Sequence, residues 1–503
     1  MTVTGRPARG DDTLATVLRG HAARTPDAPF LAFERGPGAI ETTTYAEQLA
    51  RAGRTAGALH RLGVRPGDRF GIHLTNCPEF YDAWFAAALL GAAAAPSNPL
   101  ATADELAYQV EHAGCAVVVT QPDLRETVER AGAATVVDTA EPWVRDDDVA
   151  PAAQVDPTSP VSVLYTSGTT SRPKGVLLSH AAYLHCGDVV AGHLRLRPDD
   201  RQLVVLPLFH GNAQFYSTMS ALVTGASVGL APKFTARRWS AQATALGGTV
   251  ASLFAAPIRM ILAASESDQD TAHRLRAAMF AQNVTDDQLA EFERRFDVPL
   301  IQLYGMTETV VPPLMNPLYE QRRGASIGRP VPGARVRIAD PDSRGAGELQ
   351  VHGVPGHTIM TGYLDDPAAT AGTLEPDGAG GAWLHTGDTV RADDDGYLHF
   401  VDRRKDMIKR AGENVASGEV ERVVSEHEAV FECAAVGVPD EMRDEAIHVY
   451  VVRHDGRAVT EEDLLAHCRE RMAKFKVPDH VEFVAELPRT SVGKIQKHLL
   501  RHR

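Results

Sequence analysis

The 503-residue chain has a formal net charge of −14, because 65 aspartates and glutamates outnumber 51 lysines and arginines. Hydrophobic residues make up 44% of it and charged residues 23%, which is typical of a folded globular protein and excludes a disordered chain. An acidic chain lacks the overall basic field that nucleic-acid binding requires, so we expect no nucleic-acid partner and local positive charge wherever an anion binds.

The cysteines and the apolar segments indicate a compartment. The five cysteines are odd in number and form no Cys-x-x-Cys pair, which argues against a disulfide framework or a cysteine-rich zinc site and favours a reducing cytoplasm. Residues 1–12 contain no apolar segment typical of a signal peptide. The longest apolar run, residues 84–96, is too short to span a bilayer and predicts a buried helix that leads into a strand. We therefore expect a cytoplasmic protein without a membrane span.

Predicted helices and strands alternate along the N-terminal part of the chain. Helical apolar spacing occurs at residues 14–23, 45–62, 78–90 and 104–112, and β-like runs occur at residues 69–74 and 116–120. A second region of this kind covers about residues 201–303, with strands predicted at residues 204–207, 227–230 and 299–303. This alternation predicts an α/β fold with largely parallel sheets.

The pattern changes in the C-terminal part of the chain. Short β-like runs separated by Gly/Asp/Pro turns predict a smaller β-rich subdomain, with strands at residues 335–338, 347–351 and 396–400. Helices are predicted at residues 417–427 and 461–472. The charged, glycine-containing segment at residues 401–414 predicts a domain boundary near residue 402.

One loop has the composition of a phosphate-binding site. A short apolar strand at residues 161–165 is followed directly by hydroxyl side chains, glycines and a lysine, in the segment YTSGTTSRPKG at residues 165–175. Exposed backbone N–H groups and hydroxyls can donate hydrogen bonds to a polyphosphate, and the lysine supplies a point charge. The segment lacks the Gly-Lys-Ser/Thr ending of a Walker A loop, so we do not expect a P-loop fold.

Four further motifs follow in order: YGMTET at residues 304–309, WLHTGD at 383–388, DRRKDMIKRAGEN at 402–414 and PRTSVGKI at 488–495. Together with the loop at residues 165–175, they resemble the core motifs of the adenylate-forming superfamily of acyl-CoA synthetases, peptide-synthetase adenylation domains and luciferases. The strings TSRPKG, AKFKVP and GENV resemble most the crotonobetaine/carnitine-CoA ligase-like branch. The sequence departs from the common pattern at Ser171, at residues 417–419 and at residues 280–283, where FAQN replaces a Gly-Gly-Ala segment.

The resemblance implies an architecture. We expect a large N-terminal body, residues 1–402, made of two α/β lobes and a β-rich subdomain. A small α+β C-terminal domain, residues 403–503, is expected to be mobile about a hinge near Lys405. Rotation of this domain between two half-reactions would act as a conformational gate.

The resemblance also implies a set of nucleotide-binding residues. Tyr304 is expected to stack on adenine beside Gln282 and Asn283, Asp388 to accept from the ribose hydroxyls, and Arg403 to donate to ribose or phosphate. Glu308 is expected to hold Mg²⁺, which prefers oxygen ligands, and Thr307 to donate to the α-phosphate. The residues expected to wrap the β- and γ-phosphates are Thr166, Ser167, Gly168, Thr169, Thr170 and Lys174.

Two residues are expected to act on the acyl group. Lys494 would bridge the substrate carboxylate and the α-phosphate, because a carboxylate that attacks phosphorus brings two anions together. His210 would line the acyl pocket and gate thiol entry. Asn212, Gln214 and Phe215 follow it on the expected pocket wall and include no carboxylate to pair with a trimethylammonium group. An aryl acid or a polar acid of modest size therefore fits at least as well as a carnitine-type acid.

The resulting hypothesis is an ATP-dependent acid–CoA ligase that uses a small carboxylic acid, ATP, Mg²⁺ and CoA. An adenylate-forming enzyme with another acceptor, either an amine or a carrier-protein thiol, stays open, as does a nitrite-activating arylamine diazotase. Two weaker alternatives come from other classes. Residues 225–229 match the Gly-x-Ser-x-Gly pattern of an esterase, but Ser227 lies at the start of a predicted strand rather than between a strand and a helix. A non-catalytic nucleotide-binding relative is the other.

Overall fold

The computed structural model describes residues 10–150, 153–166, 173–403, 406–410, 413–440, 444–489 and 495–501. These residues form two compact units. The first unit contains the described residues up to Arg335 together with Val351–Leu384, and the second contains Val336–Gln350 and the described residues from His385 onward.

Two sheets form the framework of the first unit. The nine-stranded sheet has the order β15-β14-β13-β12-β11-β9-β10-β1-β2, and its strands from β13 to β1 are parallel. Its strands are β1 (Pro29–Gly36), β2 (Ala39–Thr44), β9 (Arg201–Val204), β10 (Ser227–Leu230), β11 (Val250–Phe254), β12 (Ala277–Ala281), β13 (Leu300–Tyr304), β14 (Leu314–Met315) and β15 (Arg329–Pro330).

The seven-stranded sheet has the order β18-β8-β7-β4-β3-β5-β6 and is parallel from β7 to β6. Its strands are β3 (Arg69–His73), β4 (Ala93–Pro96), β5 (Val117–Thr120), β6 (Thr135–Asp138), β7 (Pro160–Thr166), β8 (Lys174–Ser179) and β18 (Gly362–Tyr363). The predicted α/β fold with largely parallel sheets is confirmed.

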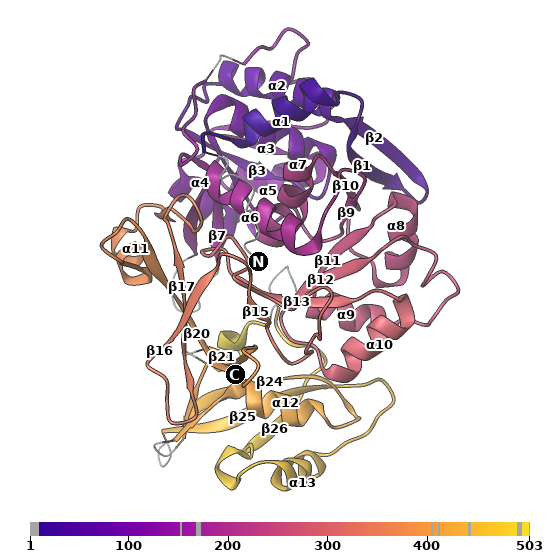
Figure 1. Cartoon of the computed structure of the whole chain (residues 1–503), viewed down its shortest axis with the longest axis vertical. Helices are drawn as coiled ribbons and strands as arrows, with labels where there is room; N and C mark the ends of the chain where they lie inside the picture. The colour runs from indigo at the N-terminus through magenta and orange to yellow at the C-terminus, as the bar shows by residue number, and fades with distance from the viewer. Residues whose placement is uncertain are drawn as a thin grey trace. The chain divides into compact units, whose positions relative to one another are not determined.

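Buried helices of the first unit pack against strands of both sheets (Figure 1). Helix α3 (Pro78–Leu90) is the clearest case, because it is apolar all round and buried along almost its whole length. It begins with proline at its first turn, ends at Gly91 in the left-handed conformation and runs into β4, as the apolar pattern predicts. The other α-helices of this unit are α1 (Leu14–Arg24), α2 (Tyr45–Arg61), α4 (Ala103–Ala113), α5 (Arg125–Arg130), α6 (His180–Leu194), α7 (Met219–Thr224), α8 (Trp239–Leu246), α9 (Ala255–Ala263), α10 (Asp286–Phe296) and α11 (Pro367–Thr373).

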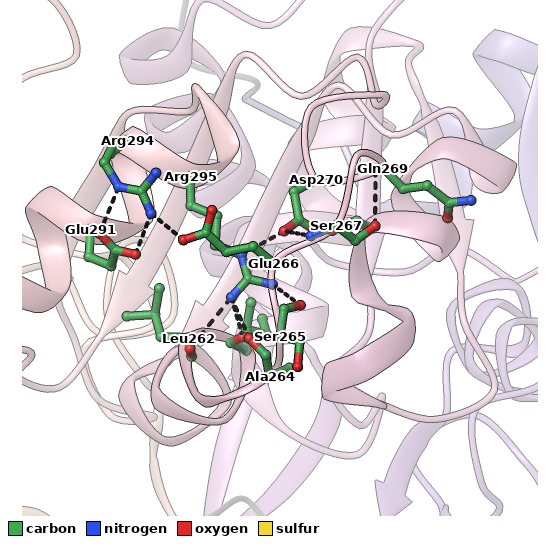
Figure 2. Close-up of polar contacts among 12 residues, drawn as sticks. Leu262, Ala264, Ser265, Glu266, Ser267, Gln269, Asp270, Glu291, Arg294 and Arg295 are labelled. Atoms are coloured by element: carbon green, nitrogen blue, oxygen red, sulfur yellow. Dashed lines mark hydrogen bonds and ion pairs between the residues drawn. The ribbon is translucent and has the colours of Figure 1, made fainter.

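Arg295 on α10 fixes the end of α9 (Figure 2). Its side chain is buried and donates to Asp270 at 2.6 Å, and its remaining N–H groups donate to the carbonyls of Ile261, Leu262, Ala264 and Ser265. A helix leaves its last carbonyl groups without intrahelical partners, so this guanidinium both caps α9 and holds the following loop. Helix α9 begins directly after β11, which makes its position relevant to the site described below.

A five-stranded sheet has the order β16-β17-β20-β19, with β21 paired to β20, and its strands are shared between the two units. They are β16 (Arg335–Ala339), β17 (Ala346–Gly353), β19 (Leu374–Pro376), β20 (Ala382–Ala392) and β21 (Leu398–Arg403). They correspond to the predicted β-rich region.

The last sheet belongs to the second unit and has the order β23-β22-β25-β24, with β26 paired to β25. Its elements are β22 (Ile408–Arg410), β23 (Glu413–Val415), α12 (Ser417–Ser425), β24 (Val430–Asp440), β25 (Asp444–Arg453), α13 (Glu461–Arg471) and β26 (His480–Phe483). Side chains alternate along β24, so Cys433 and Ala435 pack with α12 and α13, whereas Ala434 and Val436 pack with Leu487 and Leu500.

The sequence predicted a chain without a membrane-spanning helix and without disulfides. In the part of the chain that the structure describes, no helix combines the length and apolar character that crossing a membrane requires. The five cysteines are free. Burial raises the pKa of Cys115 to about 12 and that of Cys468 to about 11, so these thiols are poor nucleophiles and contribute to packing.

Candidate active site

The phosphate-loop motif is carried by a β-hairpin. Strands β7 and β8 are antiparallel, and Thr166 lies opposite Lys174 at the point where the hairpin opens into the loop. Helix α4 anchors the base of this loop, because Tyr108 donates to the Pro173 carbonyl at 2.9 Å and the Tyr165 hydroxyl lies 2.9 Å from His112 Nδ1. The two strand ends that flank residues 167–172 are therefore held in place by α4.

Tyr363 connects the phosphate-loop lysine to the second motif. The Lys174 ammonium lies 4.8 Å from the centre of the Tyr363 ring, and the Tyr363 hydroxyl donates to Glu308 Oε1 at 2.9 Å. Burial and the neighbouring Glu308 carboxylate raise the pKa of Tyr363, which keeps its hydroxyl protonated as a donor. None of the sequence motifs includes this residue. Its only local signal is a glycine–tyrosine pair, and its contacts arise because β18 pairs with β8.

The Glu308 carboxylate suits Mg²⁺. Glu308 is buried, and its backbone carbonyl accepts from Met360 N at 3.0 Å, which fixes the turn that carries it. Among the described residues, no group of three histidine, cysteine, aspartate or glutamate side chains could hold a metal ion by itself. Mg²⁺ in phosphate-transfer sites is commonly held by one or two carboxylates together with substrate phosphates. A single buried carboxylate therefore fits an ion that arrives with ATP.

The carboxyl ends of parallel strands bring together the residues that are predicted to flank adenine. Strands β12 and β13 are neighbours, with Phe280 opposite Gln302, so Gln282 and Asn283 follow one strand where Tyr304 ends the other. Gln302 Nε2 donates to both the Gln282 carbonyl and Asn283 Oδ1 at 2.9 Å. Ligands of open α/β sheets bind beyond the carboxyl ends of their strands, where these residues lie.

The turn after Tyr304 is held by its own hydroxyl side chain. Thr309 Oγ1 accepts from Met306 N at 3.1 Å and donates to the Met306 carbonyl at 3.0 Å. Thr307 therefore lies on a fixed turn between Tyr304 and Glu308. A Cβ added at Gly305 would overlap the hydroxyl of Tyr216, so the second motif packs tightly against the segment that follows His210.

His210 lies at the end of the neighbouring strand β11. Its ring centre is 5.2 Å from that of Phe254, the last residue of β11, in an edge-to-face arrangement. Its Nδ1 accepts from Asn212 N at 3.2 Å. The segment then continues as the π-helix η2 (Asn212–Thr218), a rare geometry that is frequent at functional sites.

The three residues that were expected on the acyl pocket wall differ in their contacts. Gln214 is fully buried, donates to the Leu208 carbonyl at 2.7 Å and accepts from the Tyr183 hydroxyl at 2.5 Å, so its amide already has partners within the protein. Phe215 is buried against the Tyr183 ring. Asn212 alone retains an amide without such partners among the described residues.

The two residues that are predicted to bind ribose lie in the second unit. Asp388 on β20 lies directly opposite Arg403 on β21, and Asp388 is buried. Thr386 Oγ1 accepts from Asp388 N at 3.1 Å and donates to the Leu349 carbonyl at 2.6 Å, which fixes the strand at this point. The predicted site residues that lie outside the described residues are Ser167, Gly168, Thr169, Thr170, Lys405 and Lys494, and their roles stay predictions.

Comparison with known proteins identifies the family. Residues 18–364 match the AMP-binding enzyme family and residues 419–494 match the AMP-binding enzyme C-terminal domain. The chain is 36% identical to a crotonobetaine/carnitine–CoA ligase of Escherichia coli O139:H28 (strain E24377A / ETEC) over 93% of this chain and 95% of the relative.

Two solved structures are similar over nearly the whole chain. ATP-bound MatB from Rhodopseudomonas palustris has a TM-score of 0.86 and 27% identity, covering 97% of this chain and 98% of that one. The anthranilate CoA ligase AuaEII in complex with anthranoyl-AMP has a TM-score of 0.87 and 25% identity, covering 100% and 98%. The chain therefore belongs to the AMP-binding enzyme family and is an ATP-dependent adenylate-forming ligase.

Proposed function

We propose that the protein is an acid–CoA ligase. A carboxylate oxygen attacks the α-phosphorus of ATP, the bond to pyrophosphate breaks, and the acyl-AMP then passes its acyl group to the CoA thiol as AMP leaves. The observation that carries this proposal is the Tyr363 bridge, which holds the Lys174 cation and the Glu308 carboxylate at one phosphate-binding hairpin. Membership of a family that contains named CoA ligases supports the choice of acceptor.

Different described residues would bind the phosphates, the adenine and the ribose of ATP. Lys174 and the hydroxyl of Thr166 would meet the phosphates, and Thr307 would donate to the α-phosphate. Glu308 would hold Mg²⁺, which supplies charge neutralisation at the phosphates when bound. Tyr304, with Gln282 and Asn283, would flank adenine, while Asp388 and Arg403 would hold the ribose.

Lys494 and Lys405 have proposed roles that follow from their motifs. Lys494 would stabilise the transition state of adenylation, and residues 403–503 would then rotate about Lys405 to admit the thiol. Lys494→Ala is expected to lower the rate of adenylation by a factor on the order of 10² or more. It should leave thioester formation from supplied acyl-AMP intact. Equal loss in both half-reactions would contradict this assignment.

The acceptor is tested by a product assay with purified protein and a panel of aryl, aliphatic and betaine acids. Pyrophosphate release is measured with acid and MgATP alone, and then with CoA, with hydroxylamine or with another amine added as the acceptor. In a separate reaction, nitrite replaces the acid and an arylamine is the acceptor. A thioester formed only with CoA supports the proposal. Product formation only with an amine, or only with nitrite, would replace it with one of the other adenylate-forming activities. The free cysteines support a reducing compartment such as the cytoplasm as the place of action.

A further inference from the structure

The amide of Asn212 is buried without a hydrogen-bond partner. Asn212 is 3% exposed, and among the described residues neither its Oδ1 nor its Nδ2 has a hydrogen-bond partner. Buried polar groups are nearly always paired, because an unpaired group loses its hydration without compensation. An amide with both of its atoms unpaired is therefore an exception that calls for a ligand.

Two other polar side chains of η2 have hydrogen-bond partners, which the Asn212 amide lacks among the described residues. Gln214 is bonded to Tyr183 and to the Leu208 carbonyl, and Thr218 Oγ1 donates to the Ala213 carbonyl at 2.8 Å. The packing of η2 thus provides partners for Gln214 and Thr218 but not for the amide at its first residue.

The position of Asn212 is close to the proposed chemistry. Its backbone N–H donates to His210, whose ring packs on Phe254 at the carboxyl end of β11. Further along the same π-helix, Tyr216 packs against Gly305 of the second motif. Ser252, two residues before Phe254 and hence on the same face of β11, is also buried with an unpartnered hydroxyl. Two side chains without a partner among the described residues thus belong to the two segments that meet at the His210 ring.

We infer that Asn212 selects carboxylic acids whose acyl portion carries a neutral hydroxyl or amide group, an inference that rests on the proposed acid–CoA ligase function. The Asn212 amide offers both an acceptor and donors but no charge. A hydroxyl or carboxamide can donate to Oδ1 and accept from Nδ2. A quaternary ammonium group can do neither, and an alkyl chain would leave both amide atoms unpaired.

The test compares kcat/KM for pyrophosphate release between acids that differ in one group. Suitable pairs are hexanoate with 6-hydroxyhexanoate, 3-phenylpropanoate with 3-(4-hydroxyphenyl)propanoate, and benzoate with 3-hydroxybenzoate or 3-carbamoylbenzoate. The wild-type enzyme should prefer the polar member of the best-used pair by about tenfold or more. Asn212→Leu, which nearly preserves side-chain size, should abolish or reverse that preference, and Asn212→Ser should retain part of it.

Asn316 provides a matched control. It is equally buried, but its Nδ2 donates to the Ser326 carbonyl at 2.7 Å and its Oδ1 accepts from Arg323 N at 3.0 Å. Asn316→Leu should lower the melting temperature and leave the substrate preference unchanged, whereas Asn212→Leu should keep or raise the melting temperature.

Four results would overturn the inference. A wild-type enzyme that uses the polar and apolar members of every pair equally contradicts it while leaving the acid–CoA ligase proposal intact. The same holds if Asn212→Leu leaves the preference unchanged or lowers the melting temperature as much as Asn316→Leu, because the amide would then have a structural role. Absence of pyrophosphate release with every acid would overturn both proposals together.

Discussion

Replacing Lys497 by methionine is expected to destabilise the second unit. Lys497 lies in the short helix η5 (Lys497–Leu499), and its ammonium is 2.7 Å from Glu421 Oε1 and donates to Ser417 Oγ at 2.6 Å. Glu421 also accepts from Ala435 N at 2.8 Å, and Asp402 accepts from Ser417. This cluster ties the C-terminal segment to α12 and β24.

The magnitude follows from the burial of the pair. Removing one partner of a buried ion pair costs about 3–5 kcal/mol, because the other charge is left without compensation. The side chains of Lys497 and Glu421 are 17% and 24% exposed, so some water can reach the lone carboxylate. We therefore expect Lys497→Met to cost about 2–4 kcal/mol. Glu421→Gln in the same chain should recover about half of this loss, because it removes the uncompensated charge.

The loss should also depend on pH. Burial raises the pKa of Glu421, although Lys497 opposes the shift. A carboxyl group with a raised folded pKa contributes stability that is present below its unfolded pKa and is lost as the pH rises through the folded value. Without Lys497 the folded pKa rises further. The deficit of Lys497→Met relative to wild type should therefore grow as the pH rises above the ordinary pKa of a glutamate carboxyl.

The distribution of tryptophans gives an assay for each unit. All four tryptophans, Trp84, Trp143, Trp239 and Trp383, lie in the first unit. Their fluorescence during urea unfolding reports on the first unit, so the unfolding curve followed by fluorescence should be the same for Lys497→Met and the wild type. Native-state hydrogen exchange of β24 amides reports on the second unit and should show the loss of protection. Arg422→Met removes an exposed pair with Glu426 and is expected to cost less than about 0.5 kcal/mol. A cost that small for Lys497→Met, or no recovery with Glu421→Gln, would show that the buried pair does not stabilise the second unit.

Three further variants test the first unit. Gly305→Ala should lower kcat/KM for ATP by about tenfold or more, because the added methyl displaces the turn, and adding Tyr216→Phe should restore part of the activity in a steady-state assay. Arg295→Met should cost about 3–5 kcal/mol in urea unfolding followed by tryptophan fluorescence. Burial alone would raise the pKa of Asp270, but its hydrogen bond to Arg295 keeps that pKa below the ordinary value. In the wild type, the stability that Asp270 contributes is therefore present above the ordinary pKa of an aspartate. It is lost as the pH falls through the lowered pKa of the folded state. That acid-side loss should be smaller in the variant. Glu308→Gln should lower the adenylation rate about 100-fold, and a melting temperature reduced in parallel would show a structural cause instead.

Local patterns predicted most elements because they act within a few residues. The apolar run from Trp84 onward predicts a helix followed by a strand, and the structure has α3 and β4 there. The strand predicted at residues 204–207 is displaced, since β9 ends at Val204. Asn76 donates to the Leu206 carbonyl and accepts from Leu208 N, so a distant side chain takes the hydrogen bonds that a strand would use.

The site was predictable only in part, because motifs identify residue types but not their partners. The pairing of Asp388 with Arg403, and the neighbouring positions of Gln282 and Tyr304, depend on sheet register. Tyr363 was missed since its role arises from a two-residue strand that pairs with a distant hairpin. For the same reason, the sequence could not show that Gln214 is paired within the protein.

The proposed enzyme activates a carboxylate as an acyl-AMP and transfers the acyl group to CoA. The most direct measurement is the stoichiometry of pyrophosphate, AMP and thioester, quantified by mass spectrometry with an acid found to support turnover. With acid, MgATP and CoA present together, we expect equal amounts of all three products, whereas without CoA only the pyrophosphate of the adenylation half-reaction should be released. Pyrophosphate and AMP released at the same rate without CoA, with no thioester when CoA is added, would contradict this proposal.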